Sequence, residues 1–174
     1  MTAVKSGLMV IDQHRAHIRI LFEQYLRQVA QRSGTSQKVM FPEVVQFTAT
    51  EDLMAQKIMS DLEGLGFELT DLGARNYAVN AIPAGLEGIN PIEMIRDMVV
   101  TAMEKGAGLR DEINEALALS LARNAALPYG QVLGNDEMEN LVNALFACPN
   151  VNYTPNGQKI LVILSQDELE QQFR

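Results

Sequence analysis

Two short apolar runs stand near opposite ends of this chain, and they constrain its fold more than any other feature. The runs are Leu8-Met9-Val10-Ile11 and Ile160-Leu161-Val162-Ile163-Leu164. Their length and bounding polar residues each predict a buried strand. Because strand and helix patterns alternate between them, we expect both ends to share one sheet and the middle to form an inserted lobe. The predicted fold class is α+β and two-lobed, with a mixed sheet and helices in the end-derived lobe and a smaller inserted α/β lobe.

Hydrophobic periodicity and capping residues predict the elements between these runs. A helix should follow Asp12, carry an apolar stripe at three- and four-residue spacing, and stop at Gly34. Later helices should begin at the caps Thr50, Asn90 and Asn135, near residue 109, and at a Ser165–Glu168 capping box. Further expected features are a strand over 37–47 with Pro42 at an edge or bulge, a helix end at Gly66, a hairpin of 67–72 with 77–82, a break at Gly106 and Gly108, and a loop over 148–158.

Composition excludes several classes of protein. The 174 residues carry 14 basic and 22 acidic side chains, and 47% of them are hydrophobic, so the chain can bury a core. A net charge of −8 disfavours nucleic-acid binding by this chain alone, since phosphate neutralisation needs clustered Lys and Arg. No apolar run approaches the roughly 18 residues of a membrane span. With a single cysteine and no signal peptide, we expect a soluble, cytoplasmic protein without a membrane partner.

The residues with most potential for chemistry lie near the start of the first helix. His14 and His17 are three residues apart, and with Asp12 and Glu23 they offer nitrogen and oxygen ligands for a transition metal. Cys148 could add a thiolate from the late loop. The alternative is that these are ordinary polar surface residues and a small buried thiol. No phosphate-binding glycine loop, nucleophile elbow or zinc-protease motif is present in the sequence.

The segment Asp12-Gln13-His14-Arg15-Ala16-His17-Ile18, continued to Glu23, resembles the D-Q-H-A-x-x-E-x-x-x-x-E motif in the C-terminal domain of the MutL family of mismatch-repair proteins. Leu121-Ala122-Arg123, Cys148-Pro149-Asn150 and Asp167-Glu168-Leu169-Glu170 agree with later family segments in the same order. The resemblance covers nearly the whole chain and leaves out the family's N-terminal ATPase domain, so we expect a fragment. It implies a dimerisation lobe of residues 1–49 and 108–174 and an inserted regulatory lobe of residues 50–107.

In many family members these motifs build a zinc-associated endonuclease site, and here its ligands are incomplete. The resemblance places Ile18 at a glutamate position, Ala122 at a cysteine position and Asn150 at a histidine position, while Asp12, His14, Glu23 and Cys148 remain. Ile and Ala have no donor atom, and the Asn amide is a poor zinc ligand. We therefore expect a degenerate site with no catalytic residues, no metal and no cofactor. The alternative is a divergent metal-dependent, DNA-nicking endonuclease.

The segment Gln37-Lys38-Val39-Met40-Phe41-Pro42 resembles the Q-x-L/I-x-x-P motif by which MutL proteins contact the replicative sliding clamp. An extended edge segment can offer the Gln37 amide and insert Val39 and Met40 into an apolar groove. The clamp-binding candidates are Gln37, Val39, Met40, Phe41 and Pro42. An ordinary strand interrupted by proline explains the same residues.

Together these patterns predict a non-catalytic homodimerisation and partner-docking domain that couples mismatch recognition by a MutS-like protein to downstream repair. The expected partners are a second copy, a MutS-like protein and the sliding clamp. Contact with DNA should come mainly through the family's N-terminal domain, because this chain is acidic. A third alternative is a stand-alone sensor of a small ligand, which would need an apolar pocket.

Overall fold

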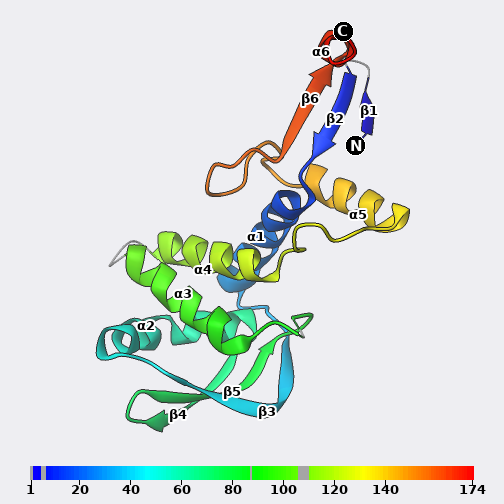
Figure 1. Cartoon of the computed structure of the whole chain (residues 1–174). Coiled ribbons are helices and arrows are strands. Elements are labelled where there is room, and N and C mark those ends of the chain that lie inside the picture. The colour runs from blue at the N-terminus through cyan, green and yellow to red at the C-terminus, as the bar shows by residue number, and fades with distance from the viewer. Residues whose placement is uncertain (1, 5–6, 87, 106–109) are drawn as a thin grey trace. The chain divides into compact units, whose positions relative to one another are not determined.

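The two ends of the chain form one antiparallel sheet, shown in Figure 1 with β1 and β2 in blue and β6 in orange-red. Its strands are β1 (Thr2–Val4), β2 (Gly7–Ile11) and β6 (Leu161–Ser165), in the order β1-β2-β6. Met9 of β2 lies opposite Ile163 of β6. The prediction that the two apolar runs share a sheet is confirmed. The expected mixed sheet is wrong, because both strand pairs are antiparallel.

This computed structural model describes residues 2–4, 7–86, 88–105 and 110–174. Their architecture is α+β, as predicted, with six helices and two three-stranded antiparallel sheets in the described residues. The chain divides into unit 1, residues 1–20 and 126–174, and unit 2, residues 21–125. The lobes expected from sequence, 1–49 with 108–174 and 50–107, divide the chain at other points, and the roles assigned to them stay predictions. None of the described helices has the length and apolar character that a membrane crossing requires.

Unit 1 contains the beginning of α1 (Gln13–Gln31), together with α5 (Asn135–Phe146) and α6 (Gln166–Gln171). A small core of Ala16, Leu145 and Ile160 joins α1 and α5 to the sheet, where Ile11 and Leu161 pack against it. The predicted Ser165–Glu168 capping box is present and starts α6. The predicted cap of α5 is wrong by one residue.

Gly134 is the N-cap of α5, and Asn135 is the first helical residue. The Glu137 carboxylate accepts a hydrogen bond from the Gly134 backbone N–H at 2.7 Å. A carboxylate in the first turn thus satisfies the free N–H group, so α5 begins without a side chain on its cap residue.

Unit 2 contains a second sheet with the order β3-β5-β4 and three helices. Its elements are β3 (Ser36–Gln46), α2 (Ala49–Leu65), β4 (Glu68–Gly73), β5 (Asn76–Pro83), α3 (Pro91–Lys105) and α4 (Arg110–Ala125). Strand β5 is central and alternates buried and half-buried residues before ending in a buried run, while α2 and α3 carry the fully buried side chains Ile58, Leu62, Met94 and Met98. The predicted hairpin and edge strand are confirmed.

Three capping predictions in unit 2 have different outcomes. Gly66 ends α2 in the left-handed region, with φ 113°, as expected. The Asn90 Oδ1 accepts hydrogen bonds from the backbone N–H groups of Ile92 and Glu93, so Asn90 caps α3 as expected. Thr48 rather than Thr50 caps α2, because Thr48 forms the reciprocal box with Glu51. The predicted break at Gly106 and Gly108 lies outside the described residues.

Candidate functional site

Strand β6 exposes apolar side chains that a buried strand would hide. Val162, Ile163 and Leu164 are 38%, 50% and 37% exposed, so the prediction of a buried run holds for Ile160 and is wrong for these three residues in the single chain. In the described sheet β6 is an edge strand, hydrogen-bonded to β2. Val162 and Leu164 lie opposite Val10 and Leu8, so these four side chains share one face of the sheet. Ile163 lies opposite Met9 and therefore points to the other face, so β6 exposes apolar side chains on both faces of the sheet. We call the exposed residues of β6 and the half-buried Leu8 and Val10 the apolar sheet surface.

The apolar sheet surface has the composition of an interior strand and the exposure of an edge. An uninterrupted apolar strand is typical of a sheet that is covered on both faces. An exposed apolar edge strand also invites pairing with another chain, and single-chain proteins usually blunt such edges with charges, proline or bulges. Described β6 carries none of these devices between Leu161 and Leu164. The surface therefore suits association with another protein molecule.

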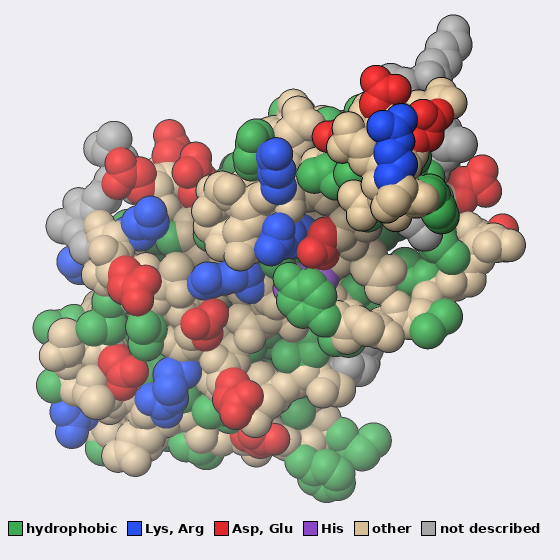
Figure 2. Space-filling model, turned by 45° about the horizontal axis from the view of Figure 1, so that its top comes forward, with side chains coloured by type: hydrophobic (Ala, Val, Ile, Leu, Met, Phe, Trp, Pro, Cys, Tyr) green, Lys and Arg blue, Asp and Glu red, His purple; other side chains and the backbone are tan. Residues whose placement is uncertain are grey.

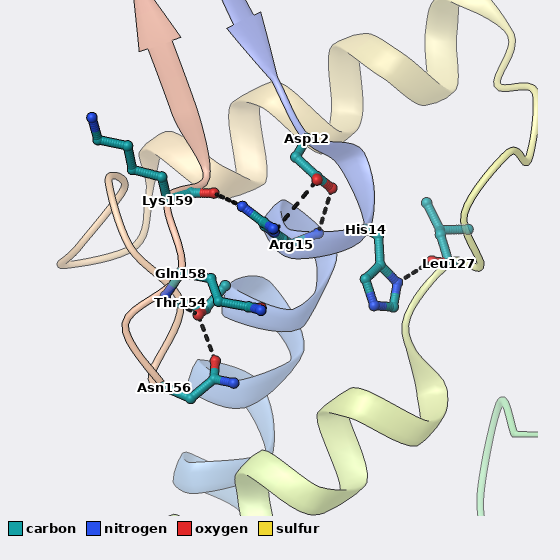
Figure 3. A network of polar contacts seen from close by, with 8 residues as sticks. All are labelled: Asp12, His14, Arg15, Leu127, Thr154, Asn156, Gln158 and Lys159. Carbon is teal, nitrogen blue, oxygen red and sulfur yellow. Dashed lines mark hydrogen bonds and ion pairs between the residues drawn. The ribbon is translucent and has the colours of Figure 1, made fainter.

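Asp12 lies at the junction of β2 and α1, where its carboxylate is engaged by Arg15 (Figure 3). The Arg15 backbone N–H donates to Asp12 Oδ1 at 3.0 Å, which is the geometry of an N-cap. Arg15 Nε lies 3.5 Å from Asp12 Oδ2, and Arg15 Nη1 donates to the Lys159 carbonyl oxygen at 2.9 Å. A guanidinium therefore supplies the positive charge beside this carboxylate, and the same side chain links α1 to the segment before β6.

His14 and His17 both contact the backbone of Leu127. Nδ1 of His14 lies 2.6 Å from the Leu127 carbonyl oxygen and donates to it, while the Leu127 N–H donates to Nδ1 of His17 at 2.7 Å. The His14 ring also contacts the Tyr129 ring in a tilted arrangement, with ring centroids 4.2 Å apart and an interplanar angle of 42°. Burial, and then the nearby His14, lower the pKa of His17. Each imidazole thus uses one ring nitrogen to fasten the segment after α4 onto α1.

The other residues of the expected site have no ligand geometry. Ile18 is buried in unit 1, and Ala122 is buried in unit 2, as core side chains. Cys148 Sγ donates to the Ala144 carbonyl oxygen at 3.4 Å. Asn150 Oδ1 accepts from the backbone N–H groups of Asn152 and Tyr153 and so closes a local turn.

These positions are divided between the two units. Asp12, His14, Ile18, Cys148 and Asn150 belong to unit 1, whereas Glu23 and Ala122 belong to unit 2. Within the described ranges, no group of three or more His, Cys, Asp and Glu side chains is placed to hold a metal ion. The donor set therefore does not fit the zinc site that the sequence resemblance implies, because Ile18 and Ala122 carry no donor, and the described contacts of the donors in unit 1 are to protein groups.

The segment 37–42 contains a bulge of β3, which begins after the paired residues Gln37 and Lys38. Lys38 pairs with Ala81 and Glu43 pairs with Val79, so four residues of β3 stand opposite the one residue between these partners. Met40 and Phe41 lie in this interval and are 85% and 79% exposed. The prediction that Pro42 marks an edge or bulge is confirmed. We call residues 39–42 the apolar bulge.

Two arginines make structural contacts within unit 1 that the sequence motifs do not indicate. Arg15 is recognisable only because it stands three residues after an N-cap aspartate, where its own N–H reaches the cap. Arg19 is buried, and its Nε and Nη2 both donate to the Tyr153 carbonyl oxygen, at 3.0 and 2.8 Å. Tyr153 lies 134 residues later in the chain, so nothing local in the sequence indicates this contact.

Comparison with known proteins assigns the family. A family model described as the MutL C terminal dimerisation domain matches residues 2–133. The DNA mismatch repair protein MutL of Bacteroides fragilis (strain YCH46) is 53% identical over 174 residues, which cover 100% of this chain and 28% of that protein. The protein of the same name from Chlorobium chlorochromatii (strain CaD3) is 34% identical over 170 residues, 98% of this chain and 26% of that protein. The chain spans 26% to 28% of the length of these relatives, and it belongs to the family of MutL C-terminal dimerisation domains.

Proposed function

We propose that this chain is the non-catalytic homodimerisation and partner-docking domain of a MutL-like mismatch-repair protein. The observation that carries the proposal is the apolar sheet surface, on which Val162, Ile163 and Leu164 are 37% to 50% exposed in the single chain. A second copy that covers this surface removes apolar area from water. The gross favourable free energy of such burial is about 25 cal/mol per Å². A twofold-symmetric dimer would present the same surface from both subunits, and stable homodimer interfaces often exceed about 1,500 Å² in total.

Sedimentation equilibrium with charge substitutions tests the dimer. The purified chain should be a dimer at micromolar concentration, and Ile163→Glu should make it a monomer, because a carboxylate in the interface would lose its hydration. Leu53→Glu is the matched control, since Leu53 is an exposed apolar residue on α2 of unit 2. Circular dichroism should show that both variants keep their helix content. A monomeric parent chain, or a dimeric Ile163→Glu protein, would contradict the proposal.

The proposed absence of nuclease activity is supported by the contacts of the remaining donor residues. Asp12 is engaged by Arg15, and His14 donates to the Leu127 carbonyl oxygen. An assay of supercoiled-plasmid nicking with Mn²⁺ or Zn²⁺, combined with metal analysis of the purified chain, decides this point. We expect nicking equal to the buffer control and equal for Asp12→Asn. Nicking that Asp12→Asn abolishes would favour the alternative, a divergent metal-dependent endonuclease.

We also propose that the apolar bulge docks on the replicative sliding clamp. Met40 and Phe41 stand out from an edge strand and are already exposed, so binding needs no unfolding of β3. Surface plasmon resonance on immobilised clamp should give a measurable, transient signal that Met40→Ala with Gln37→Ala removes. Leu72→Ala, which truncates an exposed residue of β4, should leave the signal unchanged. Equal binding by all three proteins would contradict the docking proposal.

The other predicted roles, in signalling and DNA contact, are proposed for a longer MutL-like protein that contains this domain. In this proposal the dimer joins two ATPase domains, relays mismatch recognition from a MutS-like partner, and acts in the cytoplasm. Most DNA contact is assigned to those domains, because this chain carries a net charge of −8. On the face presented in Figure 2, Asp and Glu side chains stand among the Lys and Arg side chains. DNA binding by the isolated chain should accordingly be weak and lost in moderate salt.

A further inference from the structure

Helix α5 is bordered by two adjoining hollows in unit 1. The first has a volume of about 280 Å³ and is lined by the apolar residues Ile11, Met138 and Val142. The second, of about 330 Å³, is lined by Ile20, Leu127 and Ala144 among others. Leu133 and Leu141 line both hollows, so the two form one apolar depression on either side of these leucines. We call this depression the α5 groove.

The charged residues of the α5 groove are of one sign. Glu139 lines the first hollow and Glu137 lines the second, and no Lys or Arg is among the described residues that line either one. Asp136, next to Glu137 in the first turn of α5, adds a third carboxylate to this helix near the groove. His17 lines the second hollow and, because its pKa is lowered, stays neutral at pH 7. The groove therefore combines an apolar floor with an acidic border.

The groove is separate from the apolar sheet surface. Its lining comes from α5, α1 and the segment 127–133, with Ile11 of β2, and includes no residue of β6. Met138, on its border, is 43% exposed. A second copy that covers Val162, Ile163 and Leu164 therefore does not account for this second apolar region.

We propose that the α5 groove binds a short segment of a partner protein in which apolar anchor side chains are flanked by Lys or Arg. Each hollow has the volume of a small ligand pocket. Two adjoining hollows suit two anchor side chains, which lie on consecutive turns of a helical segment or at alternate residues of an extended one. The acidic border favours basic flanks and rejects acidic ones, because like charges facing each other across an interface are unfavourable. This binding needs no metal, and it does not depend on the dimer.

Selection from a random peptide library displayed on phage, against the immobilised chain, identifies the recognised chemistry directly. Enriched peptides should carry two apolar residues flanked by Lys or Arg. A synthetic copy of one enriched peptide is then measured by fluorescence anisotropy. We expect Glu139→Lys to weaken binding about fivefold, the effect of reversing one surface charge, and Met138→Glu to weaken it further. Glu63→Lys, an exposed site on α2 with the same charge change, should leave binding unchanged.

The outcomes separate this proposal from the dimer proposal. No enrichment over a Met138→Glu target, enrichment of acidic peptides, or equal affinity for Glu139→Lys would each overturn the groove proposal. Sedimentation of the same variants supplies the second readout. If Met138→Glu becomes monomeric while the parent is a dimer, a second copy covers the groove and the proposal fails. A monomeric parent chain that still binds the selected peptides would support the groove and contradict the dimer.

Discussion

Arg15 occupies both carboxylate oxygens of Asp12, one through its backbone N–H at 3.0 Å and the other through its guanidinium Nε at 3.5 Å. One residue thus acts as the helix-capping donor and as the counter-charge. The first contact fixes where α1 begins, and the second lies beside the bond from Arg15 to the Lys159 carbonyl oxygen (Figure 3). Asp12 consequently has a structural role that needs no metal ion.

Two substitutions of Asp12 distinguish the stability that the N-cap contributes from the stability that the ion pair contributes. Asp12→Ala removes the cap and should lower the free energy of unfolding by about 1 kcal/mol, the usual worth of an N-cap. Asp12→Asn keeps an oxygen that accepts the Arg15 N–H but loses the charge, so it should cost less than about 0.5 kcal/mol, because the ion pair is partly exposed. Urea denaturation monitored by circular dichroism measures both. Equal losses for the two variants would show that the ion pair, not the cap, is the important contact.

The stability of the chain should fall as the pH drops below the ordinary histidine pKa, partly because of His17. Its folded-state pKa is lowered from 6.5, so the folded protein binds the proton more weakly than the unfolded chain does. The contribution of neutral His17 to the free energy of unfolding is fully present above pH 6.5 and is lost as the pH falls through the folded-state pKa. An imidazolium also has no lone pair at Nδ1 to accept the Leu127 N–H.

Urea denaturation at pH 7.5 and pH 5.5 measures this effect. His17→Asn keeps a side-chain acceptor and removes the titrating group. The free energy of unfolding should therefore differ less between pH 7.5 and pH 5.5 in this variant than in the parent chain. The exposed Glu63→Gln variant serves as a background control. An unchanged pH difference in His17→Asn would assign the acid sensitivity to other groups.

Gly7 permits close pairing at the end of the apolar sheet surface. Its φ is 145°, and a Cβ placed there would overlap the Leu164 carbonyl oxygen. Gly7→Ala should therefore push β6 away from β2 and weaken the dimer along with the fold. Gly130→Ala is the control, since Gly130 also has a positive φ, 83°, but no atom lies near its Cβ position. Sedimentation and urea denaturation should show a larger loss for Gly7→Ala; equal losses would mean that backbone strain alone is responsible.

Leu145 should be the most sensitive residue of α5. It is fully buried against Ala16 and Ile160, so Leu145→Ala should cost about 2 to 5 kcal/mol through lost apolar burial and the cavity left behind. The neighbouring Phe146 is half exposed, and Phe146→Ala should cost far less despite removing more atoms. Thermal unfolding of both variants gives the comparison. A similar loss for the two would indicate that Phe146 is covered in the assembled protein.

Local signals predicted the elements well and their first residues less well. The periodicity after Asp12 and the Asn90-Pro91 start correspond to α1 and α3, although α1 ends at Gln31, before the predicted stop at Gly34. Residue type favours Thr50 and Asn135 as N-caps, but the caps are Thr48 and Gly134. In both helices a glutamate three residues after the cap decides the boundary, so the reciprocal pair matters more than one favourable residue.

The candidate site was predicted in part. The sequence by itself showed that Ile18 and Ala122 cannot bind a metal, because a side chain without donor atoms has none in any fold. It also placed an apolar strand at Val162, Ile163 and Leu164, since residue type and spacing are local properties. Only the tertiary structure decided that this strand lies uncovered at a sheet edge, and that His14 and His17 meet the backbone of Leu127. Exposure and pairing depend on residues more than 100 positions away, and a local pattern carries no information about such distant neighbours.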